Sequence, residues 1–527
     1  MACANSHRNW AGRGFLALRF DYAGQGDSAG RQDDPNAVSQ WQASVAAAVS
    51  YARGTGASSV AVVGLRAGAL LAASTADTLG DLRALVLWDP IISGKAYVRE
   101  MTSLYRITVG ADDTEDDRVS VIGGVLAAEA VDNLSGLDLT RFEPSSSTQV
   151  LAAIRPENAE SPRTTRMIER SGADTIVVER QNQFVSPSSF VLSVPTYDVE
   201  RISTWISDRF DVDTTVVQPQ ITSTAQVATT STGEEIWETL QRRTDGSLFA
   251  ITTANSSTPI TAPTAIFHNT ANEHRVGPAR LWVESARSTA EFGVRAMRFD
   301  RTGTGDSGIV IPDENTSIVS PEARRNVLDI LDTLEASPLQ RIHIGMCSGA
   351  WMSAYAASRR GARSVMLFNV VNWSVNNRRP PVKKAHVDAM ESDVANRLFS
   401  IAKKIRDAGR VAQQLIPYRV WLGLSYAGLA NAPESMLRTL TRRGIKTTVS
   451  LAVEDMAWFE ANRGEQGAAR LVTTSNPPQI ISTQGDHNLF HRGSRIEARR
   501  QIMISVLDAF GNRSAQTHTR DDERLEV

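Results

Sequence analysis

Residues 341–350 read RIHIGMCSGA and predict a strand that turns sharply into a helix. The short apolar run from Ile342 to Ile344 ends at Gly345, and a helix-prone segment starts at Ala350. Gly345 and Gly349 flank Cys347 in the way that small residues flank a nucleophile held in a strained strand-to-helix turn. The alternative is a buried structural cysteine beside a tight turn. Residues farther along the chain favour the nucleophile.

Two later positions supply the partners that a cysteine nucleophile needs. Asp455 and His487 each come just after a predicted strand, so the chain order is nucleophile, acid, histidine. In this interpretation His487 takes the proton of the Cys347 thiol and Asp455 orients the imidazole ring. Glu454 and Asp486 lie next to these residues and remain alternative acids.

An oxyanion hole requires backbone N–H groups aimed at the oxygen on which charge develops. Ser348, directly after the nucleophile, is expected to supply one. Asn269 or Thr270, in the loop after a predicted strand, is expected to supply the other. Arg275 in the same loop and Met346 in the turn are candidate substrate contacts, and an ordinary salt bridge is an equal alternative for Arg275.

Composition limits the class of protein. The 527 residues are 42% hydrophobic and include 56 basic and 58 acidic residues, so no polybasic surface for nucleic acid is expected. No apolar run is long enough to span a membrane, and the first residues lack a signal-peptide pattern, so we expect a cytoplasmic protein. The two cysteines lie far apart, which gives no disulfide framework and no thiolate metal site. We expect neither a metal nor a cofactor.

Strands and helices alternate along the chain, which predicts an α/β fold with mostly parallel sheets and helices on both faces. Strands are predicted at residues 15–22, 60–64, 82–90, 264–269, 445–453 and 477–485, a hairpin around residues 244–246, and helices at residues 39–53 and 321–335.

The order of motifs occurs twice, at an offset of about 280 residues. Phe20-Asp21 with GQGDS is matched by Phe299-Asp300 with GTGDS, and GLRAGA is matched by GMCSGA. This pattern predicts a tandem duplication. The first copy has Arg66 at the position of the nucleophile and no histidine between His7 and His268. We expect Arg66 either to bind an anion or to reach a carboxylate such as Asp89.

The duplication divides the chain into two domains. Residues 1–215 form a degenerate first copy that lacks about three amino-terminal strands, unless the natural start lies upstream of Met1. A polar linker is predicted at 216–233 and the second copy at 234–513, with a helical lid at about 372–443. The tail at 514–527 is predicted to be disordered.

Four separated motifs of the second copy, HNTANEHRVGPAR, MRFDRTGTGDSG, GMCSGA and GDHNLF, resemble the α/β-hydrolase superfamily. The resemblance is to its serine-aminopeptidase-like or exosortase-associated hydrolase group, and it covers residues 235–510 well and 15–210 partially. It implies a mostly parallel sheet with a helical lid, and Cys347, Asp455 and His487 as nucleophile, acid and base.

These observations predict two tandem α/β-hydrolase domains, of which the second acts on a small-molecule ester or thioester, free or carrier-linked, through an acyl-enzyme. An acyltransferase using the same site is the alternative enzyme, because an acyl-thiol intermediate can be released to an alcohol or amine as well as to water. A non-catalytic binding scaffold is the alternative outside the enzymes.

Overall fold

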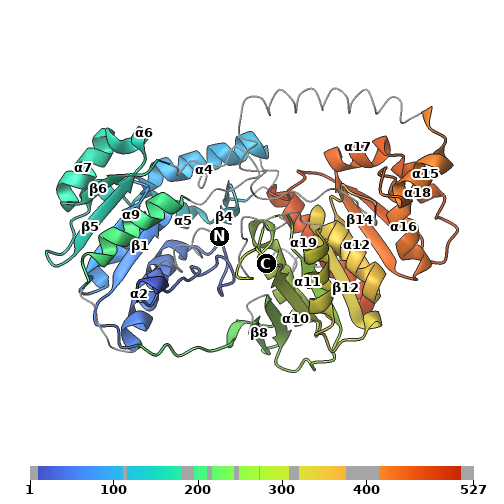
Figure 1. The fold of residues 1–527 in the computed structure, drawn as a ribbon, viewed down its shortest axis with the longest axis horizontal. Helices are drawn as coiled ribbons and strands as arrows, with labels where there is room; N and C mark the ends of the chain where they lie inside the picture. The colour runs from blue at the N-terminus through green and yellow to red at the C-terminus, as the bar shows by residue number, and fades with distance from the viewer. Residues whose placement is uncertain are drawn as a thin grey trace. The chain divides into compact units, whose positions relative to one another are not determined.

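The computed structural model describes residues 10–110, 116–179, 195–210, 217–242, 248–271, 273–307, 320–374 and 415–511. The chain divides into two compact units with the boundary between Thr222 and Ser223 (Figure 1). The predicted disordered tail lies outside the described residues. No helix among the described ranges is long and apolar enough to cross a lipid bilayer.

Unit 2 contains a nine-stranded mixed sheet in the order β15-β14-β13-β12-β10-β11-β9-β8-β7. The strands from β10 to β15 run parallel, and β7, β8 and β9 add an antiparallel extension that joins the sheet through β9 and β11. The strands are β7 (Thr224–Thr229), β8 (Glu235–Arg242), β9 (Phe249–Asn255), β10 (Thr264–His268), β11 (Arg295–Asp300), β12 (Arg341–Met346), β13 (Ser364–Phe368), β14 (Lys446–Ala452) and β15 (Gln479–Thr483).

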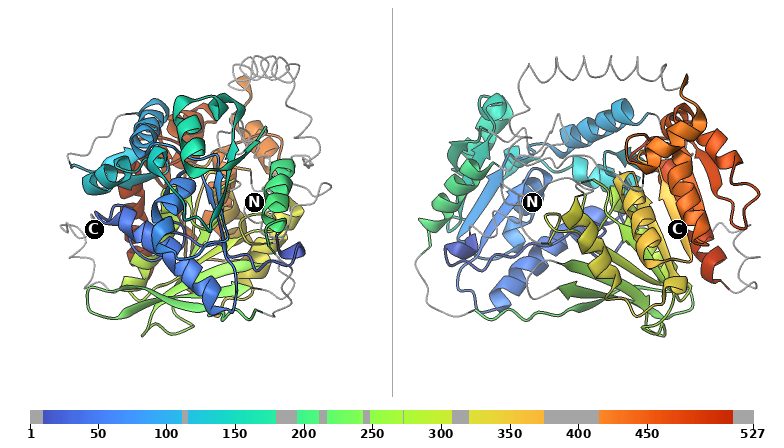
Figure 2. Two further views of the ribbon diagram at one scale, coloured as in Figure 1. Left: turned by 90° about the vertical axis from the view of Figure 1, so that its left-hand side faces the viewer. Right: turned by 45° about the vertical axis from the view of Figure 1, so that its right-hand side comes forward.

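Helices cover both faces of this sheet (Figure 2). Side chains alternate between the faces of a strand, and β13 shows the result: Val365 and Leu367 join one apolar cluster, whereas Met366 and Phe368 join another. The first cluster includes residues of α11, α12 and α16, and the second includes residues of α10 and α19. The helices are α10 (Leu281–Glu291), α11 (Pro321–Leu331), α12 (Ser348–Arg360), α15 (Tyr418–Tyr426), α16 (Pro433–Arg442), α17 (Val453–Ala461), α18 (Gly464–Ala469) and α19 (Arg492–Phe510), with short 3₁₀ turns at Pro278–Arg280 and Pro338–Gln340.

Unit 1 is built on a four-stranded parallel sheet in the order β1-β2-β5-β6. Its strands are β1 (Ala61–Leu65), β2 (Ala84–Trp88), β5 (Gln149–Ile154) and β6 (Asp174–Val177), and a separate hairpin joins β3 (Val119–Val121) to β4 (Gly124–Leu126). Its helices are α2 (Ala37–Gly54), α3 (Ala67–Thr75), α4 (Gly94–Thr108), α5 (Ala128–Ser135), α6 (Pro156–Ala159), α7 (Pro162–Ser171) and α9 (Thr196–Ser207), with 3₁₀ turns at Ala76–Thr78 and Leu139–Arg141.

The strand predicted at residues 15–22 is wrong. These residues form no strand, and Leu16, Leu18 and Phe20 remain exposed. The corresponding strand of unit 2, β11, is paired on one side with β9 and on the other with β10. In unit 1, β1 stands at the edge of the sheet, and no described strand takes the place of β10. A strand sequence without a partner has no ladder to join.

Two predicted segments also need correction. Residues 224–229, inside the predicted linker, form β7 and pair with β8, so the predicted linker extends too far. The predicted lid at 372–443 includes α16, but Leu437 and Leu440 of this helix are fully buried in the main core of unit 2. Helix α16 therefore belongs to the layer that covers the sheet. Residues 375–414 of the predicted lid lie outside the described part of the chain.

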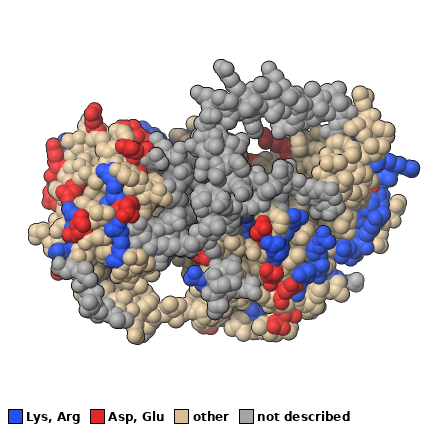
Figure 3. All heavy atoms as spheres, viewed as in Figure 1, with Lys and Arg blue, Asp and Glu red and all other residues tan. Residues whose placement is uncertain are grey.

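Charged side chains of both signs occur on the visible face of each unit, and basic ones gather over α11, α12 and α16 in unit 2 (Figure 3). Basic residues occupy the last turn of two of these helices, Arg359 and Arg360 in α12 and Arg442 in α16. Basic side chains at helix carboxyl termini interact favourably with the unpaired carbonyl groups there. Helix ends therefore account for part of this basic surface.

Candidate active site

Cys347 stands in the strained turn that the glycine spacing predicts. It connects β12 to α12 with φ 53° and ψ −114°, and its N–H donates to the carbonyl of Phe368 at 2.9 Å. A Cβ atom on Gly345 would lie 2.4 Å from backbone atoms of Gly349, and one on Gly349 would lie 2.7 Å from the carbonyl oxygen of Asn269. Both glycines are therefore required by close backbone approach. The Cys347 thiol is free and partly exposed.

His487 and Asp455 meet although they are far apart in the sequence. Asp455 lies in the first turn of α17, directly after β14, and His487 lies in the loop after β15. The Nδ1 atom of His487 is 2.8 Å and 2.9 Å from the two carboxylate oxygens of Asp455. The Asp455 side chain is almost fully buried, and that of His487 is 28% exposed. The imidazole is thus fixed on one edge and accessible on the other.

The surroundings of His487 favour its protonated form. The hydrogen bond with Asp455 and then the hydrogen bond with Cys347 raise its pKa from 6.5 to about 10, against the opposing effect of burial. Because Nδ1 faces Asp455, Nε2 is the nitrogen left for Cys347. An imidazolium between a carboxylate and a thiol can stabilise a thiolate and later return a proton to a leaving group.

The two alternative acids have other places. Asp486 accepts hydrogen bonds from the backbone N–H groups of Asn488, Phe490 and His491 at 2.7–3.1 Å, so its carboxylate orders the histidine loop. Glu454 is exposed. Asp455 is the acid that contacts the histidine.

The loop after β10 crosses directly over the turn that holds Cys347. The N–H of Ala271 donates to Oγ of Ser348 at 2.7 Å, and the hydroxyl of Thr270 donates to the carbonyl of Met346 at 3.2 Å. Asn269 is buried, and its side-chain oxygen accepts from the N–H of Arg301 at 3.3 Å. These contacts bring the segment of Asn269 and Thr270 close to that of Ser348, and an oxyanion hole formed by their N–H groups remains a prediction.

Asn369 connects the segment that carries the acid to the segment that carries the histidine. Its side-chain Nδ2 donates to the carbonyl of His487 at 2.7 Å, and its Oδ1 accepts from the N–H of Ala452 at 2.8 Å. It has a positive φ of 47° and is 1% exposed. Asparagine tolerates this conformation better than most residues. The signal that could have identified it was the alignment with Asp89, which has a φ of 44° in unit 1.

The two candidate substrate contacts have structural surroundings. Arg275 donates its backbone N–H to Asp300 at 2.8 Å and pairs its guanidinium with Asp300 and Asp306. These ion pairs favour the salt-bridge alternative for Arg275. Met346 is 1% exposed and packs in the apolar cluster with Phe267 and Phe368. Neither side chain is presented to a substrate.

Two buried histidines beside the site remain neutral. Nε2 of His268 and Nδ1 of His343 are 2.9 Å apart, and both rings are fully buried between strands β10 and β12. Burial lowers the pKa of His268 to about 3 and that of His343 well below its usual value. Both rings are therefore uncharged at neutral pH, and the contact between them joins strands β10 and β12. The described residues contain no group of three or more histidine, cysteine or acidic side chains able to hold a metal ion.

The matching position of unit 1 has the same backbone and different chemistry. Arg66 has φ 55° and ψ −118°, close to the values of Cys347. Its guanidinium pairs with Asp89 at 3.4 Å and Glu100 at 3.6 Å, and Arg155 donates to Asp89 at 2.8 Å. Of the two roles considered for Arg66, the ion pair with Asp89 is the one observed.

Comparisons with known proteins give neither a family nor a substrate. No protein-family model matches the sequence, and no curated protein matches it. Solved structures similar to the chain include mouse alpha/beta hydrolase domain-containing protein 10, with 17% identity over 51% of this chain and 98% of that one and a TM-score of 0.31. Others are XC6422 of Xanthomonas campestris, an a/b serine hydrolase without lid (12% identity, 50% and 90% of the two chains, TM-score 0.27), and an alpha-beta serine hydrolase homologue of Coxiella burnetii (14%, 51% and 96%, TM-score 0.29).

The geometry of unit 2 itself defines its class. A nucleophile-type turn follows a central parallel strand, and an acid and a histidine follow later strands in that chain order. These are the features of the α/β-hydrolase fold.

Proposed function

We propose that unit 2 is a hydrolase that cleaves an ester or thioester through an acyl-enzyme on Cys347. One observation carries the proposal: the imidazole of His487 lies between the carboxylate of Asp455 and the thiol of Cys347. In this proposal Cys347 is the nucleophile, His487 the base and Asp455 the group that orients the ring.

The first half of the reaction forms the acyl-enzyme. The Cys347 sulfur, its proton held on His487, attacks the carbonyl carbon, and the carbonyl π electrons move to oxygen. When the tetrahedral adduct collapses, the bond to the leaving group breaks, and His487 gives its proton to the departing alkoxide or thiolate. Backbone N–H groups of Ser348 and of the Asn269-Thr270 segment would stabilise the oxyanion.

The second half releases the acyl group. Neutral His487 takes a proton from water, the resulting oxygen nucleophile attacks the thioester carbonyl, and the Cys347 thiolate leaves as the acid product forms. If an alcohol or amine takes the place of water, the same step is acyl transfer. No described side chain favours one acceptor over the other.

Leaving-group chemistry supports esters and thioesters over amides. A thiolate is a better leaving group than an amine, so a tetrahedral adduct with an amide tends to expel Cys347 again unless the amine is protonated first. With a thioester the two departing groups are matched.

The decisive experiment is to trap the acyl group on Cys347. The full chain is incubated with an acyl thioester of N-acetylcysteamine, and the adduct is located by mass spectrometry while release of free thiol gives the rate. We expect the acyl mass on Cys347 and not on Cys3, and loss of turnover in Cys347→Ala. Unchanged turnover in Cys347→Ala would exclude the proposal. The matching oxygen ester and anilide, and added alcohols or amines, separate esterase, amidase and transferase activity.

We also propose that unit 1 is a duplicated hydrolase domain that has lost its catalytic side chains. Equivalent contacts recur in both units: the N–H of Asp27 donates to Asp21 at 2.9 Å as that of Asp306 donates to Asp300 at 3.0 Å. The hydroxyl of Ser28 donates to the backbone carbonyl of Asp21 at 2.7 Å, and that of Ser307 donates to the backbone carbonyl of Asp300 at 2.7 Å. Loss of all turnover in Cys347→Ala would agree with an inactive unit 1.

A further inference from the structure

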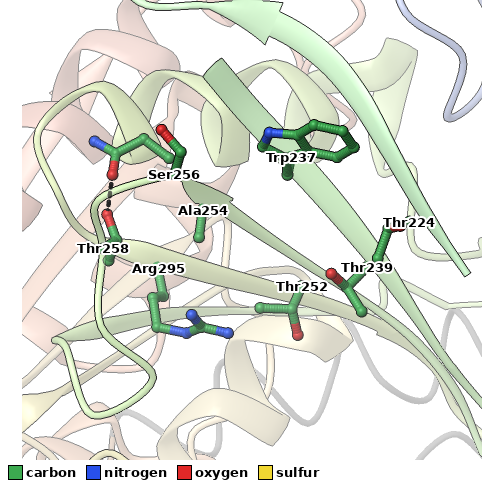
Figure 4. Close-up of a pocket in the computed structure, with 9 residues that line it drawn as sticks. Thr224, Trp237, Thr239, Thr252, Ala254, Ser256, Thr258 and Arg295 are labelled. Atoms are coloured by element: carbon green, nitrogen blue, oxygen red, sulfur yellow. Dashed lines mark hydrogen bonds between the residues drawn. The ribbon is translucent and has the colours of Figure 1, made fainter. Parts of the chain in front are cut away.

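A cavity lies on the antiparallel extension of the unit 2 sheet. It has a volume of about 390 Å³ and is lined by side chains of β7, β8 and β9, by the turn after β9 and by Arg295 at the start of β11 (Figure 4). None of its lining residues belongs to the candidate active site. The cavity is therefore a separate feature that requires its own explanation.

Strand register places its polar groups side by side. Thr224 pairs with Thr239, and Thr239 pairs with Thr252, so three threonines form a row across three strands. Trp237 pairs with Ala254 in the neighbouring row on the same face. The indole of Trp237 is 36% exposed. The face thus combines hydroxyl groups with an aromatic surface.

Arg295 supplies the positive charge in the lining of this cavity. No hydrogen bond or ion pair of its side chain occurs among the described residues, and burial lowers the pKa of its guanidinium. Arg287 and Arg298, by contrast, both pair with Glu238 at 2.9–3.1 Å. A partly buried cation without a counter-charge is unfavourable. An anion in the cavity would remove this cost.

Thr252 also lines the cavity (Figure 4). The residue is 5% exposed, and its hydroxyl oxygen is buried without a hydrogen-bond partner among the described residues. Because this oxygen is closed off from solvent, a ligand in the cavity would not reach it. The guanidinium of Arg295 is therefore the unmet polar group that the cavity presents.

We propose that this cavity binds the carboxylate or phosphate group of a small molecule. The planar guanidinium of Arg295 is suited to bidentate contact with either oxyanion. The indole of Trp237 offers an apolar surface for the body of the ligand. The site is independent of the hydrolase proposed above.

The test compares anion binding by the full chain and by variants of this face. Inorganic phosphate, acetate and glucose 6-phosphate are titrated at constant ionic strength, with the thermal midpoint and calorimetric affinity as readouts. We expect saturable stabilisation by at least one of them, and about tenfold or greater weakening in Arg295→Gln, because hydrogen bonds to charged groups are the stronger ones. Phosphate against acetate identifies the oxyanion, and tighter binding of the sugar phosphate would show a contribution from the ligand body.

Two further variants keep the test decisive. Arg295→Lys keeps the charge but not the planar fork, so it should weaken binding even if Arg295→Gln folds poorly. Arg325→Gln, which removes an exposed arginine of α11 that pairs with Glu322 of the same helix, should bind as the wild type does. Equal affinity in the wild type and Arg295→Lys, or absence of saturable binding by all three anions, would overturn the proposal.

Discussion

Replacing Asp455 by Asn tests the electrostatics of the candidate active site most directly. The pKa of His487 is raised from 6.5 to about 10, with the hydrogen bond to Asp455 as the largest cause. Each pH unit in that interval corresponds to ~1.4 kcal/mol, so the folded site favours the imidazolium by ~5 kcal/mol in total. An asparagine keeps the shape and removes the charge, so most of this preference should disappear.

The expected result is a pKa for His487 that falls well below 10, toward 6.5, in Asp455→Asn. It can be followed by NMR of protein labelled with ¹³C at the histidine rings, with His487→Gln used to assign the resonance. We also expect thioester turnover to fall by about 10²–10⁴-fold, the usual contribution of a positioned acid–base group. If the resonance titrates at the same pH in the wild type and in Asp455→Asn, the argument from the ion pair is wrong.

The same shift fixes the sign of a pH effect on stability. The folded pKa of His487 lies above its unfolded value, so its stabilising contribution is fully present below pH 6.5 and is lost as pH rises through about 10. Urea unfolding of the wild type should therefore show a decline over this window that is absent in His487→Gln. A difference between the two proteins that stays constant from pH 6 to pH 10 would contradict the assignment.

Three other changes follow from contacts in unit 2. Gly349→Ala places a Cβ 2.7 Å from the carbonyl of Asn269 and should lower turnover at least tenfold, whereas Gly423→Ala, with no atom within 4 Å, should leave turnover unchanged in the same kinetic assay. Asn369→Asp keeps the acceptor but removes the donor that holds the histidine loop, so turnover should fall while thermal unfolding shows only a loss of about 1–3 kcal/mol; full activity would argue against this positioning role. Glu238→Gln removes the carboxylate that pairs with Arg287 and with the buried Arg298, and it should cost about 3–5 kcal/mol by urea denaturation, with an unchanged midpoint as the contrary result.

Local sequence signals predicted the parts of unit 2 that depend on local chemistry. The glycines around Cys347 indicated the strained turn because close backbone approach excludes larger residues. The helix predicted at residues 321–335 does begin at Pro321, and the hydroxyl of Ser320 accepts the N–H of Ala323 as an N-cap does. The order of Cys347, Asp455 and His487 was visible because each follows a strand.

Features that depend on distant partners were not predictable in this way. Residues 15–22 have a strand composition, but none of the described strands pairs with them. Residues 224–229 have the composition of a linker, yet they pair with β8 because that edge of the sheet is available. The role of Asn369 depends on hydrogen bonds to residues 83 and 118 positions away, which no local pattern records.

The shared backbone of Arg66 and Cys347 separates two requirements that are usually considered together. A residue at such a positive φ costs about 1–3 kcal/mol, and in an enzyme that cost is commonly attributed to catalysis. Arg66 has the same conformation, although the described residues of unit 1 include no histidine. A Cβ on Gly64 would lie 2.5 Å from the backbone of α3, so the tight approach of strand and helix is what maintains the turn there. In the proposed duplication, unit 1 lost its activity by exchange of side chains on an unchanged backbone, so a strained turn by itself does not identify a catalytic unit.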